Sequence, residues 1–232
     1  MGEWDDYSVA FGQRIKTYRM ENAYTQEQLG KMLYITPTTL SRVENGKKEP
    51  SSNIIHYIAK NTKCDIDWLL LGVKSETSYM ADILEQLTVI HGGGSRAVMY
   101  VIGMIKLRLL THDDSGLEEE KYRKYRFNLR LAERICEEYD NNADEGQVFR
   151  SIRMILGKTI KEMGDILGVK STRYGYLEKY GRPTSTELIK LYDKFNVNPG
   201  FVLRGQCQEM TAINELLKTI KEGGFTISGY SK

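Results

Sequence analysis

The chain has 232 residues, of which 41% are hydrophobic and 28% charged, and it contains three cysteines. This balance excludes a disordered chain, and no apolar run approaches the roughly 20 residues that a membrane span needs. The cysteines Cys64, Cys136 and Cys207 are too far apart for a zinc spacing or a disulfide framework. We therefore expect a soluble, cytoplasmic protein with no metal, no cofactor and no membrane contact.

The net charge of +2 is close to neutral, but three segments of the chain differ in their balance of basic and acidic residues. Residues 1–74 carry 10 basic and 9 acidic side chains, residues 75–145 carry 9 and 14, and residues 146–205 carry 11 and 5. Blocks of unlike charge indicate parts with different partners. The basic third block is typical of a surface that binds a polyanion.

Helical periodicity predicts an all-α protein. The first expected helix covers about residues 7–22 and places Phe11, Ile15 and Tyr18 on one face. Several short helices follow it up to residue 72. The remaining expected elements are helices at 78–90 and 95–110, a loop at 111–116, a long charged helix at 117–141, short helices over 146–205 and an amphipathic helix at 208–222.

Residues with special roles recur at a constant offset of 134. Arg19 and Glu44 stand 25 residues apart, as do Arg153 and Glu178. The other matched pairs include Thr25 with Thr159, Gly30 with Gly164, Leu33 with Leu167 and, after a one-residue deletion, Pro50 with Pro183 and Gly72 with Gly205. So many matches at special positions favour internal duplication over chance.

The repeat predicts a chain of four parts. Residues 1–74 and 146–205 are two copies of one fold. They are joined by an acidic helical spacer at 75–145 and followed by an amphipathic helix and tail at 206–232.

The first copy contains two short helices with a tight turn between them. Thr25 and Gln28 form a capping box for the first, and Thr36 caps the second, with Pro37 at its first position. A second helix with a small polar and cationic outer face fits the major groove of DNA. The residues of that outer face are Pro37, Thr38, Ser41 and Arg42.

Residues 11–72 resemble the Cro and lambda-repressor-like helix-turn-helix domain, the Xre family. The runs TQEQLGKML, LSRVENGKKEP and DIDWLLLG carry the resemblance. It implies a domain of five helices, an ion pair between Arg19 and Glu44, and a DNA-binding transcriptional regulator of a bacterium or phage. Among such regulators we expect a repressor.

The resemblance also implies which residues contact double-stranded DNA. Gln26 is expected to bind a phosphate, as is the loop after the second helix. Arg42 is the main candidate for reading a base, because a guanidinium can bond guanine O6 and N7 together. Pro37 departs from the usual polar residue and offers only apolar contact. The full candidate set is Gln26, Thr36, Pro37, Thr38, Ser41, Arg42, Asn45, Lys47 and Lys48.

The second copy departs from the first where contacts are made. Ile160 stands at the position of Gln26, and Tyr176 stands at that of Arg42. Two interpretations stay open: a second DNA contact, or a degenerate copy kept for dimerisation or partner binding. If it contacts DNA, the candidate residues are Lys170, Ser171, Thr172, Arg173, Tyr176 and Lys179.

The spacer and the tail contain no catalytic constellation, so we expect no enzymatic activity. The helix at 95–110 is apolar nearly all round, and the helix at 208–222 has a narrower apolar stripe. We predict a homodimer formed through one of them, with packing inside a monomer as the alternative. A second hypothesis makes residues 75–232 a module that binds another protein, as antitoxins and some phage inhibitors do, while the first domain only autoregulates.

Overall fold

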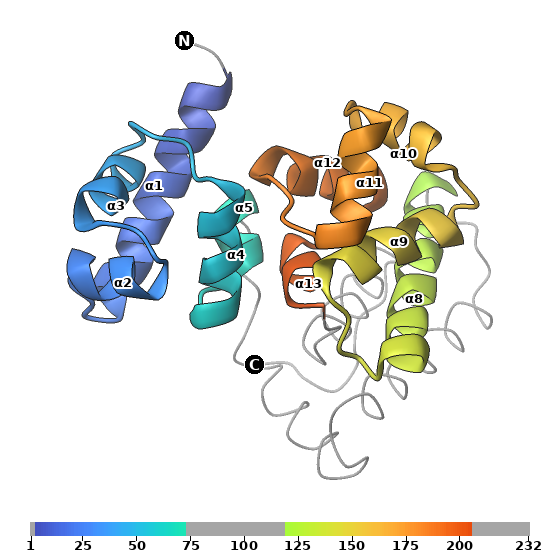
Figure 1. Ribbon diagram of the computed structural model, residues 1–232, viewed down its shortest axis with the longest axis horizontal. Helices are drawn as coiled ribbons and strands as arrows, with labels where there is room; N and C mark the ends of the chain where they lie inside the picture. Colours follow the sequence, from blue (N-terminus) through green and yellow to red (C-terminus); the bar gives the residue numbers. More distant parts are fainter. Residues whose placement is uncertain (1–2, 73–118, 206–232) are drawn as a thin grey trace, which may run out of the picture.

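The computed structural model describes residues 3–72 and 119–205, which form two groups of helices (Figure 1). Every regular element in these two ranges is an α-helix, which confirms the predicted all-α class. None of the helices described there is long and apolar enough to cross a membrane. The predicted helices at 78–90, 95–110 and 208–222 lie outside the described residues.

The first group, called here the N-terminal group, contains five helices. They are α1 (Glu3–Glu21), α2 (Gln26–Met32), α3 (Pro37–Glu44), α4 (Ser52–Asn61) and α5 (Ile66–Leu71). The second, the C-terminal group, contains α8 (Glu119–Tyr139), α9 (Glu145–Ile155), α10 (Ile160–Leu167), α11 (Ser171–Tyr180), α12 (Ser185–Phe195) and α13 (Pro199–Arg204).

Side-chain caps begin the short helices of the N-terminal group. Thr25 Oγ1 accepts from the Gln28 N–H at 3.1 Å, and Gln28 Oε1 accepts from the Thr25 N–H at 2.8 Å, which is the predicted capping box. Thr36 caps α3 by accepting from the Thr39 N–H at 3.2 Å. Such caps satisfy backbone donors that a helix leaves unpaired and stabilise it by about 1 kcal/mol each.

The core of the N-terminal group forms where α1 crosses α3. Phe11, Ile15 and Tyr18, which were predicted to share one face of α1, are all buried. Leu40 and Val43 of α3 are buried as well. Gly12 allows the close approach, because a β-carbon there would lie 2.4 Å from the carbonyl oxygen of Val43. A role for this glycine was not predicted from the sequence.

Helix α8 packs against α9 and α12 of the C-terminal group. The rings of Phe127 and Phe195 lie 5.6 Å apart, and Asn128 donates to the Phe195 carbonyl oxygen at 2.9 Å. The buried Tyr174 donates from its hydroxyl to the Phe149 carbonyl oxygen at 3.0 Å, and burial raises the pKa of this phenol. The end of the predicted spacer therefore packs with the helices that follow it.

The same ion pair occurs in both groups, buried in the first and partly buried in the second. Arg19 Nε donates to Glu44 Oε1 at 2.6 Å, and Arg153 Nε donates to Glu178 Oε1 at 2.5 Å. Each guanidinium also donates at 3.1 Å to the carbonyl oxygen of the residue five positions later in the chain. A further recurrence involves Gly146, 134 residues after Gly12, where a β-carbon would lie 2.5 Å from the Glu178 carbonyl oxygen.

The two groups contact each other through α4 and α5 on one side and α12 and α13 on the other (Figure 1). Asp67 Oδ1 accepts from the Gly200 N–H at 2.8 Å. Arg204 donates from Nη2 to the Cys64 carbonyl oxygen, also at 2.8 Å. This interface was not predicted from the sequence.

The interface gives Asp67 a pH-dependent effect on stability. Desolvation raises the pKa of Asp67 from 3.8 to about 6. The folded protein therefore binds this proton more readily than the unfolded chain, and the resulting stability is present below about pH 4 and lost as the pH rises through about 6.

We expect the wild type to lose stability relative to the Asp67→Asn variant as the pH rises from about 4 to 6. Urea titrations of both proteins at several pH values measure this difference. A difference that does not change with pH would contradict the raised pKa of Asp67.

Candidate nucleic-acid interface

Helices α2 and α3 lie at the outer edge of the N-terminal group, away from the C-terminal group (Figure 1). The turn between them closes where the Ile35 N–H donates to the Gly30 carbonyl oxygen at 2.9 Å. Tyr34 occupies the left-handed region of this turn, with a φ of 54°. The arrangement leaves one face of α3 open to a ligand.

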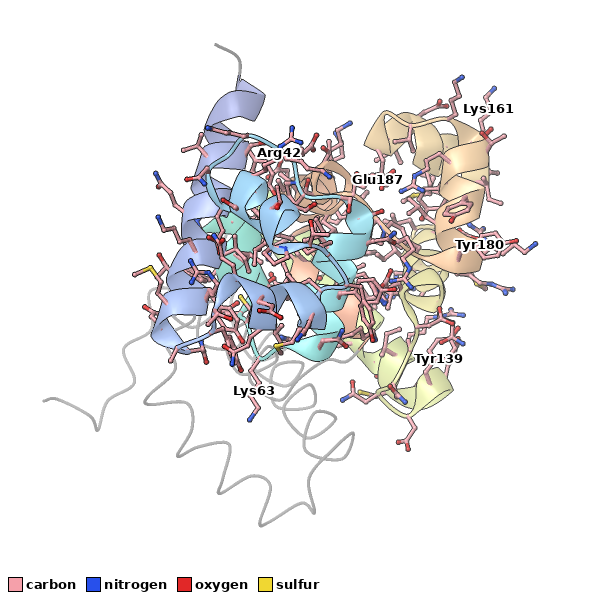
Figure 2. All side chains as sticks on the ribbon, turned by 60° about the vertical axis from the view of Figure 1, so that its left-hand side comes forward. Arg42, Lys63, Tyr139, Lys161, Tyr180 and Glu187 are labelled. Atoms are coloured by element: carbon pink, nitrogen blue, oxygen red, sulfur yellow. The ribbon has the colours of Figure 1, made fainter. Side chains whose placement is uncertain are left out.

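The open face of α3 carries the side chains predicted to read bases. Pro37, Thr38 and Arg42 are exposed, and Ser41 is half-buried. Among the described residues, the Arg42 side chain makes no hydrogen bond or ion pair. Figure 2 shows Arg42 in the upper part of the N-terminal group. Its guanidinium is therefore available for a bidentate contact with a guanine.

The segment after α3 carries the predicted phosphate contacts. Asn45, Lys47 and Lys48 are all exposed. Asn45 Nδ2 donates to the Ser41 carbonyl oxygen at 2.7 Å, and the Lys47 N–H donates to the Arg42 carbonyl oxygen at 2.8 Å. These bonds fix the backbone and leave both lysine ammonium groups in solvent.

Gln26 lies against the ion pair of Arg19 and Glu44, and this contact was not predicted from the sequence. Its Nε2 donates to Glu44 Oε2 at 2.9 Å, while Arg19 Nη2 donates to the same oxygen at 3.1 Å. The Glu44 side chain is only 1% exposed, and its hydrogen bond raises the pKa of Arg19. An amide has two N–H donors, so the second donor of Gln26 can still bind a phosphate from a position that Glu44 determines.

The outer face of α11 differs in chemistry from that of α3. Lys170, Ser171 and Thr172 are exposed at its beginning, and Tyr176 is 45% exposed. The Arg173 guanidinium lies 5.3 Å from the centre of the Tyr176 ring, and the Lys179 ammonium lies 4.9 Å from that of Tyr180. This face therefore presents aromatic rings, each with a cation beside it.

Arg173 is held by a carboxylate of its own group. Its Nε and Nη2 donate to the two Glu187 oxygens at 2.7 and 2.8 Å, and Nη2 also donates to the Arg182 carbonyl oxygen at 3.0 Å. The Glu187 hydrogen bonds raise the pKa of Arg173. Of the candidates on α11, Arg173 is the side chain with the most contacts inside the chain.

The described residues contain no group of histidine, cysteine or acidic side chains that could hold a metal ion. The surface of α3 and the segment after it presents hydrogen-bond donors and cations, among them Arg42, Asn45 and Lys47. Such groups recognise phosphates and base edges.

Comparison with known proteins identifies the class of the N-terminal group. Residues 15–69, from within α1 to within α5, match the family model described as helix-turn-helix. This confirms the predicted helix-turn-helix domain over those residues. Residues 15–69 of the N-terminal group are therefore a helix-turn-helix domain.

Two characterised proteins are similar to parts of the chain. It is 25% identical over 123 residues to the HTH-type transcriptional activator BcrR of Enterococcus faecalis, covering 44% of this chain and 60% of that protein. It is 31% identical over 65 residues to the HTH-type transcriptional regulator DicA of Escherichia coli, covering 28% and 48%. The chain thus spans about half the length of these relatives. No solved structure matches it significantly.

Proposed function

We propose that the protein is a sequence-specific transcription regulator that reads the major groove of double-stranded DNA with α3. The observation that carries this proposal is the exposed polar face of α3, held at a fixed angle by the buried bond between Arg19 and Glu44. Phosphate contacts from Gln26 and Lys47 would fix the position of the domain along the DNA, and Arg42 would read a base.

We further propose that the C-terminal group contains a second, divergent helix-turn-helix, formed by α10 and α11. The recurrence of the Arg153–Glu178 ion pair and of the close approach at Gly146 supports this proposal. Lys170, Ser171 and Lys179 are exposed, and in this proposal they would contact phosphates. Tyr176 would contribute apolar contact or a hydroxyl bond to a base.

A different candidate function is supported by the same surface. Exposed tyrosines beside cations are typical of protein interfaces, and the bond to Glu187 holds the Arg173 side chain within the group. In this alternative, the C-terminal part binds another protein and α3 alone binds DNA. The predicted homodimer through 95–110 or 208–222 concerns residues outside the described ranges and stays a prediction.

Selection of bound fragments from a random duplex library, followed by footprinting with the full chain, tests the function. We expect enrichment of one sequence whose protection depends on Arg42. Recovery of fragments without a common sequence would contradict specific DNA reading. A reporter gene behind the selected site then distinguishes the proposed repression from activation, the activity in the name of one relative.

Lys47→Ala is expected to weaken binding to all DNA sequences alike, because an ammonium contacts phosphate without regard to sequence. The slope of log affinity against log salt concentration should become less steep by about 1. Fluorescence anisotropy over a salt series measures this slope.

Lys63→Ala is the matched control for Lys47→Ala. Lys63 is also an exposed lysine, but it lies at the bottom of the N-terminal group in Figure 2, whereas Arg42 lies in its upper part. Its removal should leave the salt slope unchanged. Equal effects of the two variants would mean that net charge, and not a contact at Lys47, determines the slope.

A further inference from the structure

The two groups pack against each other through equivalent helices. In the second half of the repeat, the positions of α4 correspond to α12 and those of α5 correspond to α13, at an offset of 133. The interface contains contacts of α4 with α13, of α5 with α12 and of α5 with α13. Exchanging each helix for its counterpart turns the contact of α4 with α13 into the contact of α12 with α5, so these two contacts are equivalent. The third contact joins α5 to its own counterpart, α13. This reciprocity defines an isologous interface.

The hydrogen bond between Asp67 and Gly200 lies at the centre of this arrangement. Its two residues are 133 positions apart, so each is the counterpart of the other. A residue can contact its own counterpart only close to a twofold axis. The fit is tight at Gly200, because a β-carbon there would lie 3.3 Å from Asp67 Oδ1.

Contacts farther from the centre are reciprocal as well. His56 Nδ1 of α4 pairs with Glu145 Oε1 at the beginning of α9, the counterpart of α1. On the other side, Ser185 at the beginning of α12 lies beside the buried phenol of Tyr7 in α1. In each case the fourth helix of one five-helix set meets the first helix of the other.

The layout of the molecule agrees with a local twofold relation. In Figure 1, α4, α5, α12 and α13 occupy the middle, with α1 to α3 on one side and α9 to α11 on the other. The helix contacts described above that join the two groups involve neither α3 nor α11. Both therefore remain open to a common ligand.

We propose that the chain is an internal pseudo-dimer whose helices α3 and α11 bind two inverted half-sites of one DNA duplex. The inference rests on the proposed function, because it assumes that α3 reads DNA. A twofold relation makes the half-sites inverted and excludes a direct repeat. Because the exposed faces of α3 and α11 differ, the two half-sites have different sequences. Arg42 reads one half-site, and Tyr176 with its neighbouring lysines contacts the other.

The orientation of the half-sites can be tested with the full chain and four duplexes. They carry the selected site, the same site with its weaker half reversed, the site with five base pairs inserted between the halves, and the Arg42-dependent half alone. Five base pairs rotate one half by about half a helical turn. We expect the reversed, lengthened and half-site duplexes to bind about 100-fold more weakly than the selected site, because the second contact is lost.

Sedimentation of labelled duplex with the protein gives the number of chains on the selected site. One chain per pair of half-sites is expected, whether or not two chains associate through residues outside the described ranges. A site whose two halves are each occupied by a separate chain, or equal affinity for the inverted and reversed sites, would overturn the pseudo-dimer. A selected site that binds Arg42→Ala as tightly as wild type would instead overturn the proposed function, so the two failures are distinguishable.

A variant of the interface provides an independent test. Gly200→Val places methyl groups against Asp67 and should separate α13 from α5. This variant should keep Arg42-dependent binding to the half-site alone, which shows that the N-terminal group is folded, while its affinity for the full site falls about 100-fold.

The control for Gly200→Val is Gly157→Asn. Gly157 has a φ of 62°, which asparagine tolerates, and a β-carbon there meets no atom within 4 Å. Its affinity for the full site should equal that of wild type. Retention of full affinity by Gly200→Val would also overturn the proposal.

Discussion

Replacing Glu44 with alanine is expected to lower the free energy of unfolding by about 3–5 kcal/mol, because breaking a buried ion pair leaves an uncompensated charge. Glu44 accepts from both Arg19 and Gln26, and its side chain is 1% exposed. The Arg19 side chain is 14% exposed, so the stranded guanidinium would reach little water. Urea denaturation followed by circular dichroism measures the loss.

Glu27→Ala is the matched control for Glu44→Ala. Glu27 pairs with Lys31 on the surface of the same domain, where the two side chains are 69% and 78% exposed. Surface pairs of this kind contribute about 0.5 kcal/mol or less. A loss below about 1 kcal/mol for Glu44→Ala would mean that the domain does not depend on the buried pair.

Arg42→Ala is expected to weaken binding to the preferred DNA site by about 1–3 kcal/mol while leaving non-specific binding nearly unchanged. Arg42 is exposed and projects from α3 without an ion pair in the described part of the chain, so its removal should not disturb the fold. Anisotropy titrations with the selected duplex and with a scrambled duplex measure both affinities.

Specificity at the contacted base pair should relax in Arg42→Ala. A set of duplexes, each with one base pair of the site replaced, identifies the contacted position with the wild type. The variant should bind all four base pairs at that position with similar affinity. An equal loss on the selected and scrambled duplexes would assign Arg42 to a phosphate. Unchanged unfolding of Arg42→Ala in urea is the accompanying control.

Local signals explain why much of the N-terminal group could be predicted from the sequence. Caps depend on residues three positions apart, and the structure places Thr25 and Thr36 at the beginnings of their helices as expected. The pair of Arg19 and Glu44 was implied by the family resemblance. Gly12 was missed, although its match with Gly146 at the same offset of 134 was present in the sequence.

Contacts between distant segments could not be predicted. Asp67 and Gly200 each look like ordinary residues of a short helix, and only their packing brings them together. The bond from Gln26 to Glu44 depends on a rotamer that no spacing reveals. The bond of Arg173 to Glu187 depends on the angle between α11 and α12, which tertiary packing sets.

The packing of α5 on α13 within a single chain has a consequence for how binding depends on dose. Two separate subunits must first meet, so the amount of competent dimer rises with the square of a dilute concentration. Two groups carried by one polypeptide are already together at any concentration. Occupancy of a site with two half-sites would then rise in simple proportion to the number of protein molecules. A mutation could also change one group of helices without changing the other.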